Sequence, residues 1–132
     1  MNDDARRALA ERFVAALATP DTDALAAILA PDARFWVNIG PSEYDRTERL
    51  ALLALEHSHL ATLEMAEVRI QTTAEGFVVE AVTVATTSDG VSLAIPVCLV
   101  VDVRDGRVGR VAEYADSADA APLLRAMSGG RP

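Results

Sequence analysis

The chain has 132 residues and a formal net charge of −8, and 51% of its residues are hydrophobic and 24% charged. This length and composition are those of one globular domain and exclude a disordered chain. The acidic balance and the aromatic content of 5% exclude a nucleic-acid-binding protein, because phosphate binding needs an excess of positive charge on at least one face.

The residue inventory excludes several kinds of site. All 12 basic residues are arginines, which excludes Schiff-base chemistry and lysine-dependent phosphate loops. The single cysteine, Cys98, excludes an internal disulfide and a cysteine-built zinc site. His57 and His59 are too few for a histidine-rich metal centre. We therefore expect no metal and no organic cofactor.

The N-terminus and the hydropathy profile indicate where in the cell the protein is located. The chain opens with the acidic pair Asp3-Asp4, where a secretory signal would be basic and then apolar. No apolar run approaches the ~20 residues that span a bilayer. We therefore expect a cytoplasmic protein without a membrane partner.

The first part of the chain is expected to form two helices and a strand. Residues 3–18 place Leu9, Phe13 and Leu17 on one helical stripe. A second, short helix is expected to begin at residue 21 or 22 and to be stopped by Pro31. Residues 34–39 then predict a strand, because aromatic and β-branched residues dominate them.

A third helix is expected after the Gly40-Pro41 break. Ser42, with Asp45 three residues on, could cap it, and it would run to about His57.

From residue 62 onward the hydrophobic pattern has a period of two. Its phase changes near Met65, which indicates a β-bulge that bends the strand. Three turns that each contain a glycine then separate long apolar runs, a pattern typical of hairpins. The expected strands and the closing helix occupy, in order, residues 62–73, 77–86, 91–103, 107–114 and 117–127.

Helices and strands in separate parts of the chain predict an α+β fold. We expect a strongly bent antiparallel sheet, shaped like a cone and wrapped around the N-terminal helices, with an apolar cavity at its open end. Residues 1–127 would form this single domain, and residues 128–132 a flexible tail.

Four strings of the sequence resemble a known superfamily: residues 11–17 (ERFVAAL), 25–33 (LAAILAPDA), 105–108 (DGRV) and 113–116 (EYAD). They are similar to the nuclear transport factor two-like superfamily, which includes ketosteroid isomerases, limonene-1,2-epoxide hydrolases and SnoaL-like polyketide cyclases. The resemblance covers nearly the whole chain. It implies the cone fold strongly and the reaction weakly, since this scaffold carries many unrelated activities.

The isomerase chemistry does not fit the residues present. The resemblance places its oxyanion tyrosine on Phe13, its general-base aspartate on Val37 or Asn38, and its protonated aspartate on Cys98. None of these side chains can supply the base or the strong donors that enolisation requires. Steroid isomerisation is therefore excluded.

The epoxide hydrolases fit better, but incompletely. The resemblance places their water-positioning tyrosine and asparagine on Trp36 and Asn38, and their water-activating aspartate on Glu113. Their arginine and their acid-acting aspartate would fall on Ala81 and Thr83, so the acid is missing. SnoaL-type cyclases rely on a single acidic residue, and they fit this pattern better.

Glu113 and Asn38 are the first two candidates for catalysis. Strand alternation puts Glu113 on the face that the resemblance turns inward, where an apolar cavity would raise its pKa; the alternative is a rim glutamate paired with an arginine. Asn38 would orient water or a substrate oxygen, or would simply bond the Gly40-Pro41 turn.

Six further residues complete the candidate site. His57 is a candidate acid, with a helix-stabilising histidine as the alternative, and Tyr44 could donate its phenol near the mouth or be solvated. Trp36 is expected to form pocket wall. Phe13, Cys98 and Thr83 complete the expected substrate-binding set, although the apolar run around Cys98 favours an inert buried thiol and Thr83 offers only a neutral hydrogen bond.

The predicted function is that of a cofactor-independent enzyme. It would be a SnoaL-like cyclase, an isomerase or an epoxide-opening enzyme of natural-product metabolism, acting on a polyketide- or terpenoid-like molecule. The alternative is a non-catalytic ligand-binding or dimerisation module of the same fold. Apolar residues on both faces of the long strands, among them Val82 and Val84, also predict a homodimer through the outer sheet face.

Overall fold

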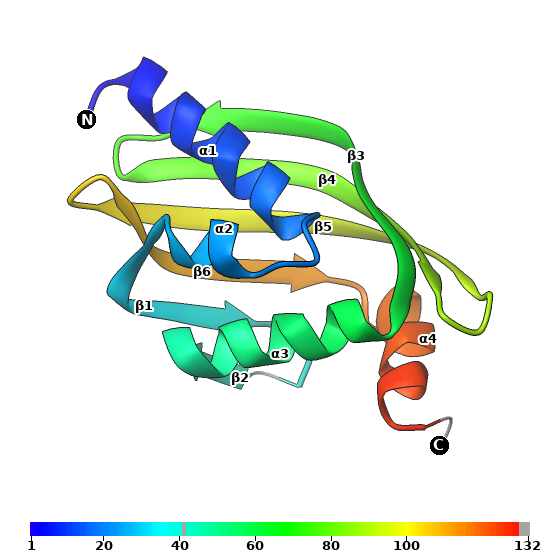
Figure 1. Cartoon of the computed structure of the whole chain (residues 1–132). Helices are drawn as coiled ribbons and strands as arrows, with labels where there is room; N and C mark the ends of the chain where they lie inside the picture. Colours follow the sequence, from blue (N-terminus) through cyan, green and yellow to red (C-terminus); the bar gives the residue numbers. More distant parts are fainter. Residues whose placement is uncertain (41, 130–132) are drawn as a thin grey trace.

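The computed structural model describes residues 1–40 and 42–129. Along the chain the elements are α1 (Asp3–Leu17), α2 (Asp23–Ala26), β1 (Leu29–Val37), β2 (Ser42–Asp45), α3 (Arg46–Ser58), β3 (Leu60–Thr72), β4 (Gly76–Thr87), β5 (Ser92–Arg104), β6 (Arg107–Ala115) and α4 (Ser117–Met127) (Figure 1). The expected α+β class is confirmed.

The six strands form one sheet in the order β2-β1-β6-β5-β4-β3. Strands β3 to β6 are an antiparallel meander, as the glycine-bearing turns predict. Strand β1, however, pairs with β6 in parallel. The two strands are far apart in the chain, so no hairpin turn sets their relative direction.

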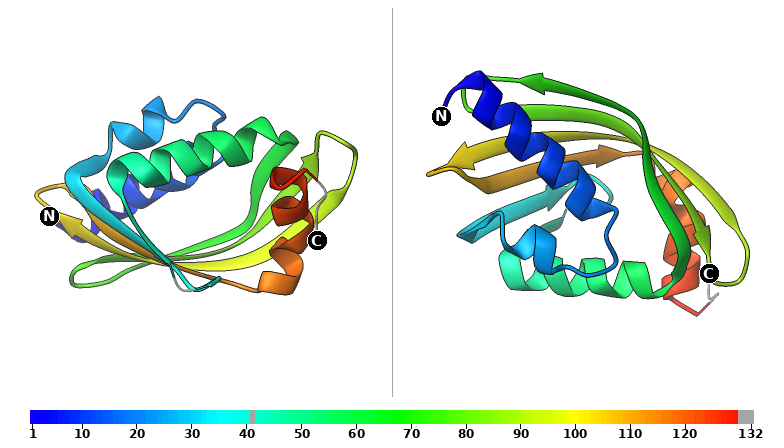
Figure 2. Two further views of the ribbon diagram at one scale, coloured as in Figure 1. Left: turned by 90° about the horizontal axis from the view of Figure 1, so that it is seen from below. Right: turned by 45° about the horizontal axis from the view of Figure 1, so that its top comes forward.

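The sheet is strongly curved, and α1, α2 and α3 all lie on its concave face (Figure 2). A β-bulge in β3 contributes to this curvature: Glu67 has a φ of 51°, and the pairing with β4 shifts register between Ala66 and Arg69. The sequence pattern places the bulge near Met65, and the structure places it two residues further along, at Glu67. A bulge bends its strand and increases the local twist.

Two N-terminal boundaries differ from the expectation. Helix α2 is a single turn, and Pro31 lies within β1, at the irregularity of its pairing with β6 between Leu29 and Arg34, where a missing N–H is tolerated.

Ser42 begins the edge strand β2 and caps no helix. Helix α3 is instead capped by Asp45, whose carboxylate accepts from the Glu48 N–H while Glu48 binds back to the Asp45 N–H.

The core consists of two hydrophobic clusters. In the larger, Phe13 of α1 packs edge-on against Phe77 of β4, with ring centroids 5.7 Å apart, so that α1 is fixed across the sheet. The smaller joins Ala120 of α4 to Ile95 and its neighbours at the far end of the sheet. No helix among the described residues is long and apolar enough to span a membrane.

The expected tail begins as the cap of α4. The backbone N–H groups of Ser128 and Gly129 donate to the carbonyls of Leu124 and Ala126, 3.1 and 3.2 Å away, and so continue the last turn. The remaining expected tail residues, 130–132, lie outside the described residues, as does Pro41.

Candidate active site

A cavity of about 260 Å³ lies between α3, α4 and the concave face of the sheet. Its volume is close to the lower end of the ~300–1,000 Å³ that small-molecule pockets occupy. Most of its lining is apolar and comes from both core clusters, for example Leu53, Leu63, Ile95, Val97, Leu99, Ala120 and Leu123. The polar residues on its wall are Tyr44, Arg49, Glu56, His57, Thr83 and Glu113.

Glu113 projects into this cavity from the middle of the sheet. Its strand β6 is flanked by β1 and β5, so that Glu113 stands between Val37 and Leu99. Along β6 the side chains of Val111, Glu113 and Ala115 point inward, and those of the residues between them point outward. The Glu113 side chain retains 27% of its accessible surface. Because Glu113 belongs to the lining, a cavity ligand can reach this carboxylate.

Arg49 of α3 is the nearest cation to Glu113. It is 7% exposed, and its Nη2 lies 4.0 Å from Glu113 Oε1. Its Nη1 donates to Oε1 of Glu56, two turns further along the same helix, over 3.3 Å. One guanidinium therefore lies between two carboxylates.

Burial raises the pKa of the Glu113 carboxyl above its ordinary value, because an apolar environment disfavours the charged form. The positive charge of Arg49 opposes this rise in the pKa, and the negative charge of Glu56 adds to it. The net effect is a carboxyl group that can bind and release a proton nearer to neutral pH than an exposed glutamate does.

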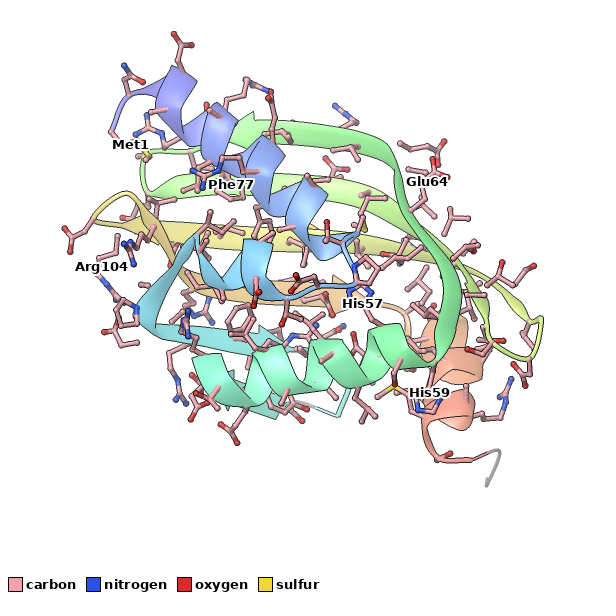
Figure 3. The ribbon with its side chains drawn as sticks, in the orientation of Figure 1. Met1, His57, His59, Glu64, Phe77 and Arg104 are labelled. Carbon is pink, nitrogen blue, oxygen red and sulfur yellow. The ribbon has the colours of Figure 1, made fainter. Side chains whose placement is uncertain are left out.

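Three other predicted residues also lie on the cavity wall: His57 of α3, Tyr44 of β2 and Thr83 of β4. His57 extends from α3 towards the C-terminal end of α1, whereas His59 points away from it beside α4 (Figure 3). The Thr83 hydroxyl donates to the Met65 sulfur over 3.5 Å. The structure thus brings Glu113, His57, Tyr44 and Thr83 around one space.

Asn38 is not part of the cavity lining. Both ends of its carboxamide bind the backbone of Ala115, and the strand-end turn that sequence suggested as the alternative is not its partner. The structure thus places Asn38 outside the cavity in which it was expected to orient water or a substrate oxygen, and it engages one amide N–H and one lone pair of Oδ1 within the protein.

The expected placement of three further residues is also wrong. Trp36 and Cys98 lie on the convex face of the sheet, where Trp36 packs on Tyr114 with ring centroids 5.2 Å apart and Cys98 pairs with Tyr114 across β5 and β6. Trp36 borders only a gap of about 10 Å³. Phe13 is buried in the core against Phe77. Strand parity decides the first two, since a side chain one residue out of phase faces the opposite side.

Sequence reasoning missed Arg49 and Glu56. The signal is the helical spacing of Arg49, Leu53 and Glu56 at i, i+4 and i+7, which puts two opposite charges on the same stripe as a core leucine. Within the described residues, no group of three potential ligands among histidine, cysteine, aspartate and glutamate could hold a metal ion.

Comparisons with known proteins agree with this architecture. A profile of the SnoaL-like domain matches residues 10–111. No curated protein matches the sequence significantly.

Among solved structures, a candidate isomerase from Bacillus subtilis superposes with a TM-score of 0.78 at 16% identity, covering 99% of this chain and 98% of its own. A candidate SnoaL-like polyketide cyclase from Shewanella denitrificans gives 0.78 at 15% identity, with 91% and 96% covered. A candidate hydroxylase from Streptomyces galilaeus gives 0.80 at 18% identity, with 99% and 89% covered. At these identities the likeness shows the fold alone.

Proposed function

The chain belongs to the SnoaL-like domain family, and on that premise we propose that it is a cofactor-independent enzyme that moves a proton on a small hydrophobic molecule. The observation that carries this proposal is Glu113, a carboxyl group of raised pKa on the wall of an apolar cavity. A general acid or base works best when its pKa is close to the operating pH, and water-poor surroundings strengthen its interactions with the substrate.

The proposed step is enolisation of a carbonyl compound. The Glu113 carboxylate takes a proton from the carbon next to the carbonyl, and the C–H electron pair moves onto the carbonyl oxygen as an enolate. Where the enolate is conjugated with a double bond, its remote carbon takes the proton from Glu113, which shifts the double bond and is an isomerisation; alternatively, the enolate carbon attacks a second carbonyl, which closes a ring. In the second case the new alkoxide takes the proton from Glu113, and the carboxylate is restored.

Tyr44 and His57 are the groups that would face the substrate oxygen, because both contribute to the same wall and both can donate a hydrogen bond. Either could also act as the acid that an epoxide-opening reaction needs and that Thr83 cannot supply. The volume of about 260 Å³ favours a molecule of one or two rings. Polyketide- and terpenoid-like ketones of that size are the substrate class that we propose.

Proton exchange on a bicyclic ketone tests the proposal directly. In D2O, the protein should accelerate deuterium incorporation at the carbons next to the carbonyl of 2-tetralone, measured by proton NMR. Glu113→Gln, with an unchanged circular dichroism spectrum, should lose at least ~100-fold of this rate, which is the contribution typical of a general base. Glu64→Gln is the matched control, because Glu64 is exposed and projects away from the ribbon of β3 (Figure 3).

A ligand-binding module without catalysis is the second candidate function. It is favoured by the engagement of Asn38 with the Ala115 backbone, which leaves Glu113 without an amide partner in the cavity. Binding of 2-tetralone without accelerated exchange in the wild-type protein would favour the module. Exchange at the wild-type rate in Glu113→Gln would contradict the catalytic role of this residue.

A further inference from the structure

We propose that Glu56 is a positioning residue for Glu113: it holds the Arg49 guanidinium back, so that Glu113 is only partly neutralised and is left free to exchange a proton. The catalytic consequence rests on the function proposed above, whereas the positioning itself can be measured without any substrate.

The geometry of Arg49 is the first support. Its two terminal nitrogens are divided between the two carboxylates, with a hydrogen bond of 3.3 Å to Glu56 and a longer separation of 4.0 Å to Glu113. The partner in the same helix is therefore the closer one. Because Arg49 and Glu56 lie on one stripe of α3, the helix holds this pair together whether or not a ligand fills the cavity.

The charge count of the cavity is the second support. Two carboxylates, Glu56 and Glu113, face one guanidinium, and the other ionisable side chains on the wall are His57 and Tyr44. The lining residues from α1, β3, β4, β5 and α4 carry no ionisable group. With both carboxylates ionised, one negative charge would stay uncompensated among apolar side chains, which is costly. The cluster therefore favours one bound proton.

Glu113 is the carboxylate that should hold this proton. It has the longer contact with Arg49, so its charge is the less compensated of the two, and it stands between Val37 and Leu99 in the middle of the sheet. Removing the charge of Glu56 should release Arg49 towards Glu113 and should also remove a repulsion. Both changes stabilise the ionised form of Glu113.

Carboxyl-carbon NMR titration of Glu56→Gln tests this role. Protein labelled with carbon-13 in the glutamate side-chain carboxyl is titrated, and the Glu113 signal is assigned by its absence in Glu113→Gln. The proton affinity of Glu113 should fall at least ~10-fold in Glu56→Gln, since a shift of one pKa unit corresponds to that factor. Glu64→Gln should leave it unchanged, and an unchanged titration in Glu56→Gln would overturn the proposal.

The unmodified protein supplies a second measurement that needs no variant to fold. In the wild-type titration, Glu113 should keep its proton to a higher pH than an exposed glutamate does, and a Glu113 pKa at or below the ordinary glutamate value would overturn the proposal.

Activity separates this inference from the proposed function. If 2-tetralone exchange occurs, Glu56→Gln should move the acidic limb of its pH–rate profile to lower pH and reduce the plateau, because a carboxylate of lower pKa is a weaker base. If Glu56→Gln alters the Glu113 titration but the wild-type protein does not accelerate 2-tetralone exchange, only the proposed enzymatic function is contradicted. Exchange that persists with an unaltered titration would contradict the role of Glu56 alone.

Discussion

The side chain of Asn38 and the backbone of Ala115 are joined by two hydrogen bonds. Asn38 Nδ2 donates to the Ala115 carbonyl over 3.1 Å, and Asn38 Oδ1 accepts from the Ala115 N–H over 3.0 Å. The backbone N–H of Asn38 also donates to the Glu113 carbonyl over 3.1 Å. A carboxamide thus takes the place of a peptide group just after β1 ends at Val37, and it fixes the part of β6 that carries Glu113.

Replacement of Asn38 by alanine should therefore reduce stability. Two part-buried hydrogen bonds are lost and two backbone groups of Ala115 are left without their partner, so the free energy of unfolding should fall by about 2 kcal/mol. Urea denaturation measures this difference. Asn38→Asp keeps the acceptor and loses the donor, and it should have a smaller effect at low pH, where its carboxyl can donate. An unchanged midpoint in Asn38→Ala would show that the two bonds contribute nothing net.

Glu113 should make the stability of the protein depend on pH. In the unfolded chain a glutamate titrates near ~4.3, and the pKa of Glu113 in the folded protein is higher. Between these two values the folded protein binds more protons than the unfolded chain, so this group lowers the free energy of unfolding as the pH rises.

The Glu113→Gln variant has no ionisable group at this position, so it lacks this contribution to the pH dependence of the free energy of unfolding. The free energy of unfolding of the variant minus that of the wild type should therefore increase as the pH rises from about 4.3 to the raised pKa, and stay constant above it. Urea denaturation at a series of pH values measures it. A difference that does not change with pH would mean that burial does not disfavour the Glu113 carboxylate.

Arg49 should be the most sensitive position in the cavity wall. In Arg49→Met, Glu56 and Glu113 face each other without a cation, and breaking such a buried pair costs about 3 kcal/mol at pH 8. The loss should be smaller at pH 5, where the carboxyls can take up protons, and smaller again in the double variant Arg49→Met/Glu56→Gln. Equal losses in the single and the double variant would argue against a shared cluster.

We propose that the convex face of the sheet packs against a second copy of the chain. Trp36, Tyr114, Val100 and Val84 lie on this face, and the last three are 46%, 37% and 38% exposed. A sheet with only one covered face carries polar residues on the other, and a large exposed apolar patch marks an interface. The same face also carries charged residues, Glu64 beside Val84, Glu80 beside Cys98 and the Arg34–Glu43 ion pair at the β1–β2 edge, which would supply the polar contacts of the interface.

Sedimentation velocity at micromolar concentration tests this interface. The wild-type protein should sediment as a dimer, and Val100→Glu as a monomer, because a carboxylate would be buried without a partner. Val91→Glu is the matched control: Val91 is also exposed, at 42%, but it lies in the turn between β4 and β5. A monomeric wild-type protein would contradict the proposal.

The order of the elements could be predicted because its signals are local. The period of two along residues 62–114, the glycine-bearing turns and the Ser117–Met127 helix depend on neighbours in the chain, and the structure has them nearly where they are expected. Strand alternation likewise put Glu113 on one face with Val111 and Ala115, and it was the resemblance to a known superfamily that implied the inward direction of this face. Local reasoning failed where a long-range contact outweighs propensity, as in Ser42–Asp45, which became an edge strand by pairing with β1.

The amino-acid sequence by itself determined an acidic α+β fold of lysine-free composition, with Val111, Glu113 and Ala115 on one face of its last strand. Only the tertiary structure decided which groups surround that glutamate. It placed Arg49 and Glu56 beside it, turned Trp36 and Cys98 to the convex face, and used Asn38 to bind the backbone of Ala115. The reason is physical: the pKa of a carboxyl group depends on charges and burial within a few ångströms, and those neighbours come from segments that are distant in the chain.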